Sequence, residues 1–548
     1  MGTIAFIVLL LGMVVLSSII VRSCVALPLP MVQIALGAVA ARVVTYRVSL
    51  EPAVLFQLFL APLLFLDGWR IPRAGLFRDK GTILSLALGL VLITVLGIGA
   101  FIHWLIPAFS WPAAFALAAI LSPTDTIAVS SVAARVPLPR RLMLILEGES
   151  LLNDASGLVC FRFAVVAALT GNFALWRAAG TFLWLAVGGL VAGAAICLAA
   201  NAAKDWVSRR WGEDVGAQIL VSLIIPFAAY LMADAIGASG ILAAVAAGLM
   251  MGIEERAGRA SAITRIQRAA VWDAVQFAGN GVIFVLLGHQ LPEILGGANT
   301  AIRQAGVSGL PWFAFDVLAV CVALAALRAA WTGVALGVRY GLGERVATDS
   351  STSLARLVAI STFAGARGAV TLAAAMAIPL VARADVPWPA RDVSILMAAG
   401  VILVSLVSAN AGLALVTRPL KRSATSATGE ENGIRSLAAL AALQAIEQAL
   451  REPMAQGSRA HVYAQAGGRI AADYHRRIAA HSPTAADKPS ARQASEVERR
   501  LRLVALAAER KELNSAATFG RQSQELIREL VYEIDLQESQ LTSQARRT

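Results

Sequence analysis

The chain has 548 residues, of which 58% are hydrophobic and only 15% are charged, whereas about 25% are charged in an ordinary soluble protein. The charges are unevenly distributed, with 50 in residues 1–422 and 32 in the last 126 residues. The first part is too poor in charge to form a normal water-facing surface, so we expect it to lie in a lipid bilayer. This composition excludes a large soluble enzyme. The net charge of +12 also lies in the first part, because the tail is nearly neutral, and this argues against a nucleic-acid partner.

Thirteen apolar stretches are long enough to cross a bilayer, which requires about 20 mostly apolar residues. The predicted spans are 3–21, 24–41, 52–69, 82–108, 111–134, 142–171, 178–203, 215–236, 238–253, 271–290, 311–338, 355–381 and 392–417. The fold class predicted from this pattern is an all-α polytopic membrane protein. The four cysteines fall in apolar stretches without a CxxC pair, so we expect no disulfide, no bound metal and no cofactor.

The basic residues of the loops set the predicted orientation. If the N-terminus is outside, 21 Lys or Arg residues fall in inside loops and six in outside loops. Cytoplasmic loops carry such an excess. The pattern therefore predicts a multi-pass protein with the N-terminus outside and the C-terminus in the cytoplasm, and the short loops favour the cell (inner) membrane.

Two domains follow from these observations. Residues 1–422 form the predicted transmembrane domain. Residues 423–548 begin with a Ser/Thr/Gly-rich linker and continue in segments rich in Ala, Leu, Glu and Arg. We expect a mostly helical cytoplasmic tail, with either a regulatory role or no defined role.

Several ionisable residues lie inside the predicted spans, where each costs about 2.5–3.5 kcal/mol or more. Asp125, Asp154 and Arg367 lie 12–14 residues into their spans, about 18–21 Å at 1.5 Å per residue. They therefore lie near the middle of a core about 30 Å thick. Asp67 lies nearer a helix end and is a possible accessory group. The other charged residues within spans are Glu149, Arg162, Asp234, Asp316 and Arg328.

The sixth span carries an unusual density of oxygen ligands in the segment Glu147–Asp154. Ser150 and Asp154 share one helix face, and Glu149 and Asn153 share a neighbouring face. Carboxylates, amides and hydroxyls suit a hard cation. A carboxylate removed from water can also exchange a proton near neutral pH. The alternative is a buried ion-pair network that joins helices, and Glu149 has a ready partner in Arg367 at the same depth.

Two spans contain helix-breaking residues close to these charges. The fifth has Pro123 in mid-span, and the twelfth has Gly365 and Gly368 on either side of Arg367. Irregular backbone at this depth is tolerated where it lines a cavity or is buried in protein. Interrupted helices in corresponding places of two halves are typical of inverted-repeat transporters.

Four motifs carry a family resemblance: SPTDTIAV at 122–129, EGESLLND at 147–154, FVLLGHQL at 284–291 and GARGAVTL at 365–372. They are similar to signatures of bacterial sodium/proton antiporters of the monovalent cation:proton antiporter-1 family, in matching order over residues 1–420. The resemblance implies a homodimer of thirteen-helix protomers, each with a dimerisation bundle and a moving core bundle. It also implies that spans 5 and 12 are unwound and cross near the ion.

The same resemblance implies the roles of individual residues. Asp154 would be the main carboxylate for both ion and proton, and Asp125, Ser150 and the backbone of Thr124 would complete the Na⁺ site. Asn153, where electrogenic relatives carry a second aspartate, goes with electroneutral exchange of one cation for one proton. Glu149 would form a structural ion pair with Arg367.

The leading interpretation is an antiporter of Na⁺ or Li⁺ against H⁺, serving pH and sodium homeostasis, and a K⁺/H⁺ antiporter is the alternative. An intramembrane protease is disfavoured because GxGD and HExxH motifs and a mid-membrane Ser–His pair are missing from the sequence. A receptor or structural membrane protein with a buried polar network is the third class considered.

Overall fold

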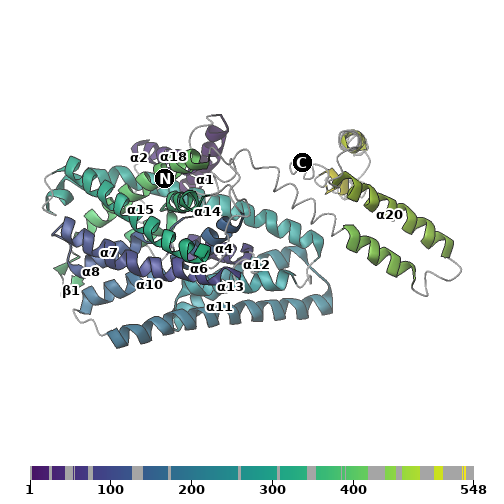
Figure 1. Cartoon of the computed structure of the whole chain (residues 1–548), viewed down its shortest axis with the longest axis horizontal. Helices are drawn as coiled ribbons and strands as arrows, with labels where there is room; N and C mark the ends of the chain where they lie inside the picture. Colours follow the sequence, from purple (N-terminus) through teal and green to yellow (C-terminus); the bar gives the residue numbers. More distant parts are fainter. Residues whose placement is uncertain are drawn as a thin grey trace. The chain divides into compact units, whose positions relative to one another are not determined.

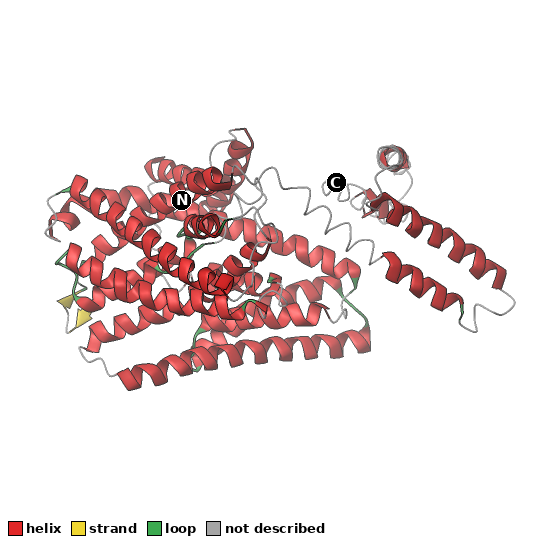
Figure 2. Ribbon diagram, in the orientation of Figure 1, coloured by secondary structure: helices red, strands yellow, loops and turns green. Residues whose placement is uncertain are grey.

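Helices form almost all of the part of the chain that the structure describes, as the apolar runs predict (Figure 2). The computed structural model describes residues 3–23, 28–43, 54, 56–71, 78–125, 140–170, 175–256, 261–304, 309–341, 353–379, 381–383, 386–388, 390–417, 439–451, 460–481, 499–509, 533–534 and 536–538. These fall into two compact units, Met1–Lys421 and Arg422–Thr548. Their assignment to transport and to regulation stays a prediction.

The first unit contains the long helices (Figure 1). In chain order they are α1 (Thr3–Ser23), α2 (Leu29–Val43), the π-helical η1 (Phe56–Leu60) with α4 (Ala61–Arg70), α6 (Lys80–Leu84) with η2 (Ser85–Gly89) and α7 (Leu90–Leu105), α8 (Trp111–Leu121), α10 (Arg140–Thr170), α11 (Leu175–Trp211), α12 (Val215–Ala235), α13 (Gly240–Arg256), α14 (Ala262–Gln304), α15 (Leu310–Gly341), α16 (Leu354–Phe363), α17 (Ala369–Met376) and α18 (Arg391–Thr417). A short antiparallel pair, β1 (Val381–Arg383) and β2 (Val386–Pro387), precedes α18.

Each of the thirteen predicted spans overlaps a helix in this series. Among the described residues, eight helical segments are long and apolar enough to cross a membrane on their own. The others are shorter or lie partly outside the described residues, so the count of thirteen crossings stays a prediction. The chain is nevertheless a multi-pass membrane protein, because large apolar side chains such as Leu96, Val322 and Ile224 remain about 60% exposed.

Helix α14 is held against α2 by very close backbone contact. A Cβ atom added at Gly288 would lie 1.9 Å from the carbonyl oxygen of Ile34, and one added at Gly37 would lie 2.0 Å from that of Val285. Only glycine permits this approach. Small residues between membrane helices allow dense packing where lipid supplies no hydrophobic driving force.

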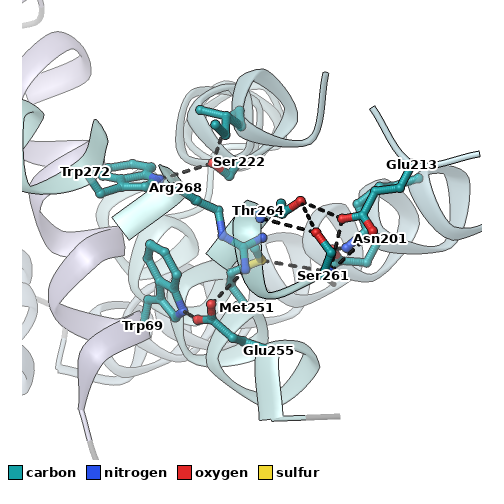
Figure 3. A network of polar contacts seen from close by, with 12 residues as sticks. Trp69, Asn201, Glu213, Ser222, Met251, Glu255, Ser261, Thr264, Arg268 and Trp272 are labelled. Carbon is teal, nitrogen blue, oxygen red and sulfur yellow. Dashed lines mark hydrogen bonds and ion pairs between the residues drawn. The ribbon is translucent and has the colours of Figure 1, made fainter. Parts of the chain in front are cut away.

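A polar network fixes α14 to α4, α12 and α13 (Figure 3). Arg268 of α14 is 1% exposed, lies over the ring of Trp69 at 5.3 Å and donates to Glu255 Oε1 at 2.8 Å. Trp69 Nε1 donates to the other oxygen of Glu255. One turn further along the same face of α14, Trp272 Nε1 donates to Ser222 Oγ at 3.1 Å. Three neighbouring helices therefore hold the first half of α14.

The start of α14 is capped within the same network. The backbone N–H of Thr264 donates to Ser261 Oγ at 3.2 Å, the pattern of an N-cap. Thr264 Oγ1 donates to Glu213 at 2.6 Å, and this hydrogen bond lowers the pKa of Glu213. The α11–α12 connection is thereby tied to α14.

A second ionic cluster joins the ends of three other helices. Asp79, just before α6, is fully buried and contacts Arg141 of α10 at 2.7 Å, Arg339 of α15 at 2.6 Å and its neighbour Arg78 at 3.3 Å. Burial acts to raise the pKa of Asp79, but hydrogen bonds from Arg141 and Arg339 outweigh it, so the pKa lies below its usual range.

The second unit contains separate helices. A short helix spans residues 439–450, and α20 spans Ala460–His481. The two are joined by at least one apolar contact, because Gly467 of α20 lies against the side chain of Leu450. The predicted helical character of the tail is present in these segments.

We expect Asp79→Asn to lower stability at neutral pH by about 1–3 kcal/mol, since buried groups would lose charged hydrogen-bond partners. The folded-state pKa is depressed, so this stabilisation is present above the unfolded value of about 3.9 and is lost as pH falls through the lower folded value. Thermal melts of the purified protein should therefore differ between wild type and variant at pH 7, and the difference should begin to shrink only below about pH 4. Asp392→Asn, at a side chain 76% exposed, is the matched control, and equal effects of the two would contradict the prediction.

Candidate functional site

A cavity lies beside the non-helical residues that follow α8 and precede α17, and it is also lined by residues of α4, α10 and α14. Its empty volume is about 520 Å³, which includes space open to the surroundings. Its walls are Leu60, Leu63, Leu64, Asp67, Pro123, Thr124, Asp125, Ser150, Asp154, Gln276, Asn280, Gly368, Val370 and Thr371. Five of the eight predicted site residues therefore line one cavity, although they come from three separate parts of the sequence.

Two helices stop beside this cavity. Helix α8 ends at Leu121 and residues 122–125 are not helical, while α16 ends at Phe363 and α17 begins only at Ala369. The two irregular segments are in direct contact, because the N–H of Asp125 donates to the carbonyl of Ala366 at 2.7 Å. The backbone is therefore not helical at Gly365 and Gly368, whereas the unwinding and crossing of spans 5 and 12 stays a prediction. The rest of the predicted fifth span lies outside the described residues.

Arg367 donates hydrogen bonds to backbone carbonyls at the end of α8 and in the non-helical segment before α17. Its Nε donates to the carbonyl of Leu121 at 3.0 Å, its Nη1 donates to the carbonyl of Gly365, and its own N–H donates to Ser405 Oγ at 3.0 Å. Leu121 is the last residue of α8, so the guanidinium caps a helix C-terminus, where a positive charge is favourable.

Glu149 forms an ion pair as predicted, but its partner is Arg328 and not Arg367. Glu149, 1% exposed, accepts two hydrogen bonds from Arg328 of α15, one of them from Nη2 to Oε2 at 2.9 Å. Arg328 Nε also donates to the carbonyl of Ser361 at 2.7 Å. Depth along a span shows which charges share a level, but it does not show which helices are neighbours. Helix α15 packs against α16 and places Arg328 beside Glu149.

Side chains of α10 hold the irregular segment 122–125 in place. Ser150 Oγ donates to the carbonyl of Thr124 at 2.6 Å, and Asn153 Nδ2 donates to Thr124 Oγ1 at 2.9 Å. The side-chain oxygen of Asn153 accepts from the N–H of Asp154. Asn153, only 2% exposed, is not among the residues that line the cavity. Its contacts are those of a residue that positions Thr124 and Asp154.

The carboxylates of the cavity differ in their surroundings. Asp154 is 7% exposed, and its buried Oδ1 has no hydrogen-bond partner within the described part of the chain. Asp125 lies against Gly368, where an added Cβ would come within 1.8 Å of its Oδ2. Gly368 directly precedes α17, so this carboxylate is next to a helix N-terminus, which favours negative charge. Asp67 is exposed and lines the cavity from α4.

Three polar residues of the cavity were missed in the sequence: Gln276, Asn280 and Thr371. Gln276 and Asn280 are four residues apart on α14 and share one helix face. A polar stripe in an otherwise apolar span was the available signal. Thr371 lay inside a recognised motif but carries no charge, so depth gave no reason to select it.

We expect a double-mutant cycle to identify the partner of Glu149. Removing one member of a buried pair leaves an uncompensated charge at about 3–5 kcal/mol, so Glu149→Gln and Arg328→Met should each destabilise strongly. Their combined effect should be at least about 1 kcal/mol smaller than the sum of the two. The same cycle with Arg367→Met should be closer to additive. Unfolding in mixed detergent measures all three, and a larger coupling to Arg367 would reverse the assignment.

Comparisons with known proteins agree with the geometry. Residues 6–417 match a family described as sodium/hydrogen exchanger, transmembrane. A "Sodium, potassium, lithium and rubidium/H(+) antiporter" of Bacillus pumilus is 40% identical over 75% of this chain, and the match spans 61% of that protein's length. An uncharacterized Na(+)/H(+) exchanger of Escherichia coli is 34% identical over 98% of both chains.

A solved structure shows the same fold. The sodium proton antiporter of Methanocaldococcus jannaschii superposes with a TM-score of 0.56 at 19% identity, over 76% of this chain and 97% of that one. The family match covers most of the chain, and the Escherichia coli relative is similar from end to end. This chain belongs to the transmembrane sodium/hydrogen exchanger family.

Proposed function

We propose that the chain exchanges Na⁺ or Li⁺ for H⁺ across the membrane. The observation that carries this proposal is the convergence of Asp154, Asp125 and Ser150 with Thr124 on one cavity beside two interrupted helices. These groups offer oxygen atoms only, as hard cations require. A family named for this exchange, and relatives with such names, support it.

The proposed cycle depends on competition for Asp154. Either a dehydrated cation or a proton neutralises this carboxylate, so the site is occupied by one or the other. Asp125, Ser150 and the Thr124 carbonyl supply the remaining ligands for the cation. Ser150 Oγ donates to the Thr124 carbonyl oxygen at 2.6 Å. A carbonyl oxygen has two lone pairs, so the second one can bind an ion. Movement of the core bundle then exposes the loaded site to each side in turn, by alternating access.

K⁺/H⁺ exchange is the second candidate. The Bacillus relative carries potassium and rubidium in its name beside sodium and lithium. The same oxygen ligands suit all four ions, and the geometry of the cavity does not separate them. A comparison of Na⁺-, Li⁺- and K⁺-driven proton flux decides between the two candidates.

The remaining features of the proposal follow from charge and family. The excess of basic loop residues supports an inner-membrane protein with its C-terminus in the cytoplasm. The resemblance to antiporters supports a homodimer that serves pH and sodium homeostasis. No chemical step is assigned to the chain, and both substrates are ions, so the proposal includes neither enzymatic activity nor a cofactor.

We expect Asp154→Asn to abolish cation-dependent proton flux in proteoliposomes, because it removes the group that both substrates need. Insertion and folding should persist. Asp316→Asn is the matched control, since Asp316 is also an intramembrane carboxylate with 7% exposure but lies outside the cavity. Flux that survives in Asp154→Asn, or that disappears equally in both variants, would refute the assignment.

We also expect the exchange to be electroneutral. Asn153 cannot ionise, so Asp154 alone trades one cation for one proton. A membrane potential is worth about 2.3 kcal/mol per charge per 100 mV and should leave the equilibrium unchanged. The measurement is the cation gradient that balances a fixed pH gradient at several clamped potentials. A balance point that moves with voltage would show that a second charge is carried, with Asp125 or Asp67 as the first suspects.

A further inference from the structure

Three buried oxygen atoms without hydrogen bonds belong to residues of the same cavity. They are Oδ1 of Asp154, Oγ1 of Thr371 and Oδ1 of Asn280, and none has a partner among the described residues. A buried polar atom left without a partner costs about 1–3 kcal/mol. Native proteins keep few such groups, and those that persist call for an explanation such as an ion or a function. Two of the three belong to residues without charge.

Asn280 lies on a different helix from the other two residues. Asp154 and Thr371 come from α10 and α17, on the side of the interrupted helices, whereas Asn280 comes from α14. Its neighbour on the same helix face, Gln276, already has its side-chain oxygen occupied by Arg70 Nη1 at 2.7 Å. The amide oxygen of Asn280 is therefore the one that α14 leaves available in the cavity.

The position of Asn280 is firmly fixed. Eight residues before it, Trp272 is fully buried and hydrogen-bonded to Ser222. Eight residues after it, Gly288 lies in backbone contact with Ile34 of α2. A side chain held between two such anchors presents its oxygen in a set place, which is what ion coordination requires.

A neutral oxygen acts differently on the two substrates. An amide carbonyl coordinates a hard cation through its dipole, as backbone carbonyls do in ion channels. It does not take up a proton near neutral pH, and the titratable groups that face this cavity are Asp67, Asp125 and Asp154. Such a ligand therefore raises affinity for the cation without raising affinity for the proton.

We propose that Asn280 supplies a neutral oxygen ligand to the transported cation from the α14 wall and so sets cation affinity and selectivity. This inference rests on the proposed exchange function. In Asn280→Ala the cation loses one oxygen, while the carboxylates that take the proton stay in place.

The test compares Asn280→Ala with Gln290→Ala in the full-length protein. Gln290 also lies on α14 and also has a buried side-chain oxygen without a partner, but it is outside the cavity. We expect Asn280→Ala to raise the KM for Na⁺ by about tenfold, equivalent to about 1.4 kcal/mol, with maximal flux within about twofold of wild type. The ratio of the KM values for Na⁺, Li⁺ and K⁺ should change, and Gln290→Ala should resemble wild type.

A second variant distinguishes the loss of a cation ligand from a distortion of the site. Asn280→Asp keeps an oxygen at the same place, so at alkaline pH it should restore the KM for Na⁺ to the wild-type value or below. Equilibrium binding of radioactive Na⁺ to the detergent-purified protein should weaken about tenfold in Asn280→Ala and recover in Asn280→Asp.

The measurements distinguish failure of the proposed role of Asn280 from failure of the proposed exchange function. Unchanged KM, selectivity and binding in Asn280→Ala, or equal losses in Gln290→Ala, would overturn the role of Asn280 while exchange by the wild type stands. Absence of cation-driven proton flux in the wild type would refute the proposed exchange instead. In that case the Na⁺ binding comparison still decides whether Asn280 is a ligand, and lack of Na⁺ binding by the wild type would overturn that role as well.

Discussion

Backbone groups inside a lipid bilayer have no water to bind, and the arrangement of this site depends on how the non-helical residues 122–125 and 364–368 meet that constraint. Arg367 donates to the last residue of α8, and Arg328 donates to Ser361 near the end of α16. The N–H of Asp125 is satisfied by Ala366 of the other segment. These contacts allow irregular backbone at membrane depth, and irregular backbone brings polar groups from distant parts of the sequence to one cavity.

The same contacts determine the charge of the cavity. Arg328 forms an ion pair with Glu149, and the guanidinium of Arg367 donates to backbone carbonyls. Asp154 retains a buried oxygen without a partner. The two deeply buried guanidinium groups therefore contact Glu149 and backbone carbonyls, and within the described residues Asp154 Oδ1 receives a hydrogen bond from neither. A site built in this way favours small cations and protons over anions.

Much of the fold could be predicted from the sequence because a membrane span is a local property of about 20 residues. Helix periodicity placed Ser150 and Asp154 on one face of α10, and depth placed Asp125 at a similar level, since both depend on position within one helix. That Asp125 joins them at one site was implied only by the family resemblance. The partner of Glu149 could not be predicted, because pairing depends on which helices are neighbours, and Arg328 is 179 residues away in the chain. Asn280 was missed for a different reason: an uncharged amide in a span gives little warning that its oxygen faces a cavity.

The wide separation of Glu149 and Arg328 has a consequence for biogenesis. Helix α10 enters the membrane with its carboxylates before α15 has been made, because 179 residues separate the two partners. At about 5–20 residues per second, synthesis of that stretch takes on the order of 10–40 s. During this interval the nascent protein must shelter Glu149 with water, lipid headgroups or the insertion machinery. Arrival of α15 then supplies the guanidinium that pairs with Glu149, so the cost of an unpaired buried charge ends only when that helix has been inserted.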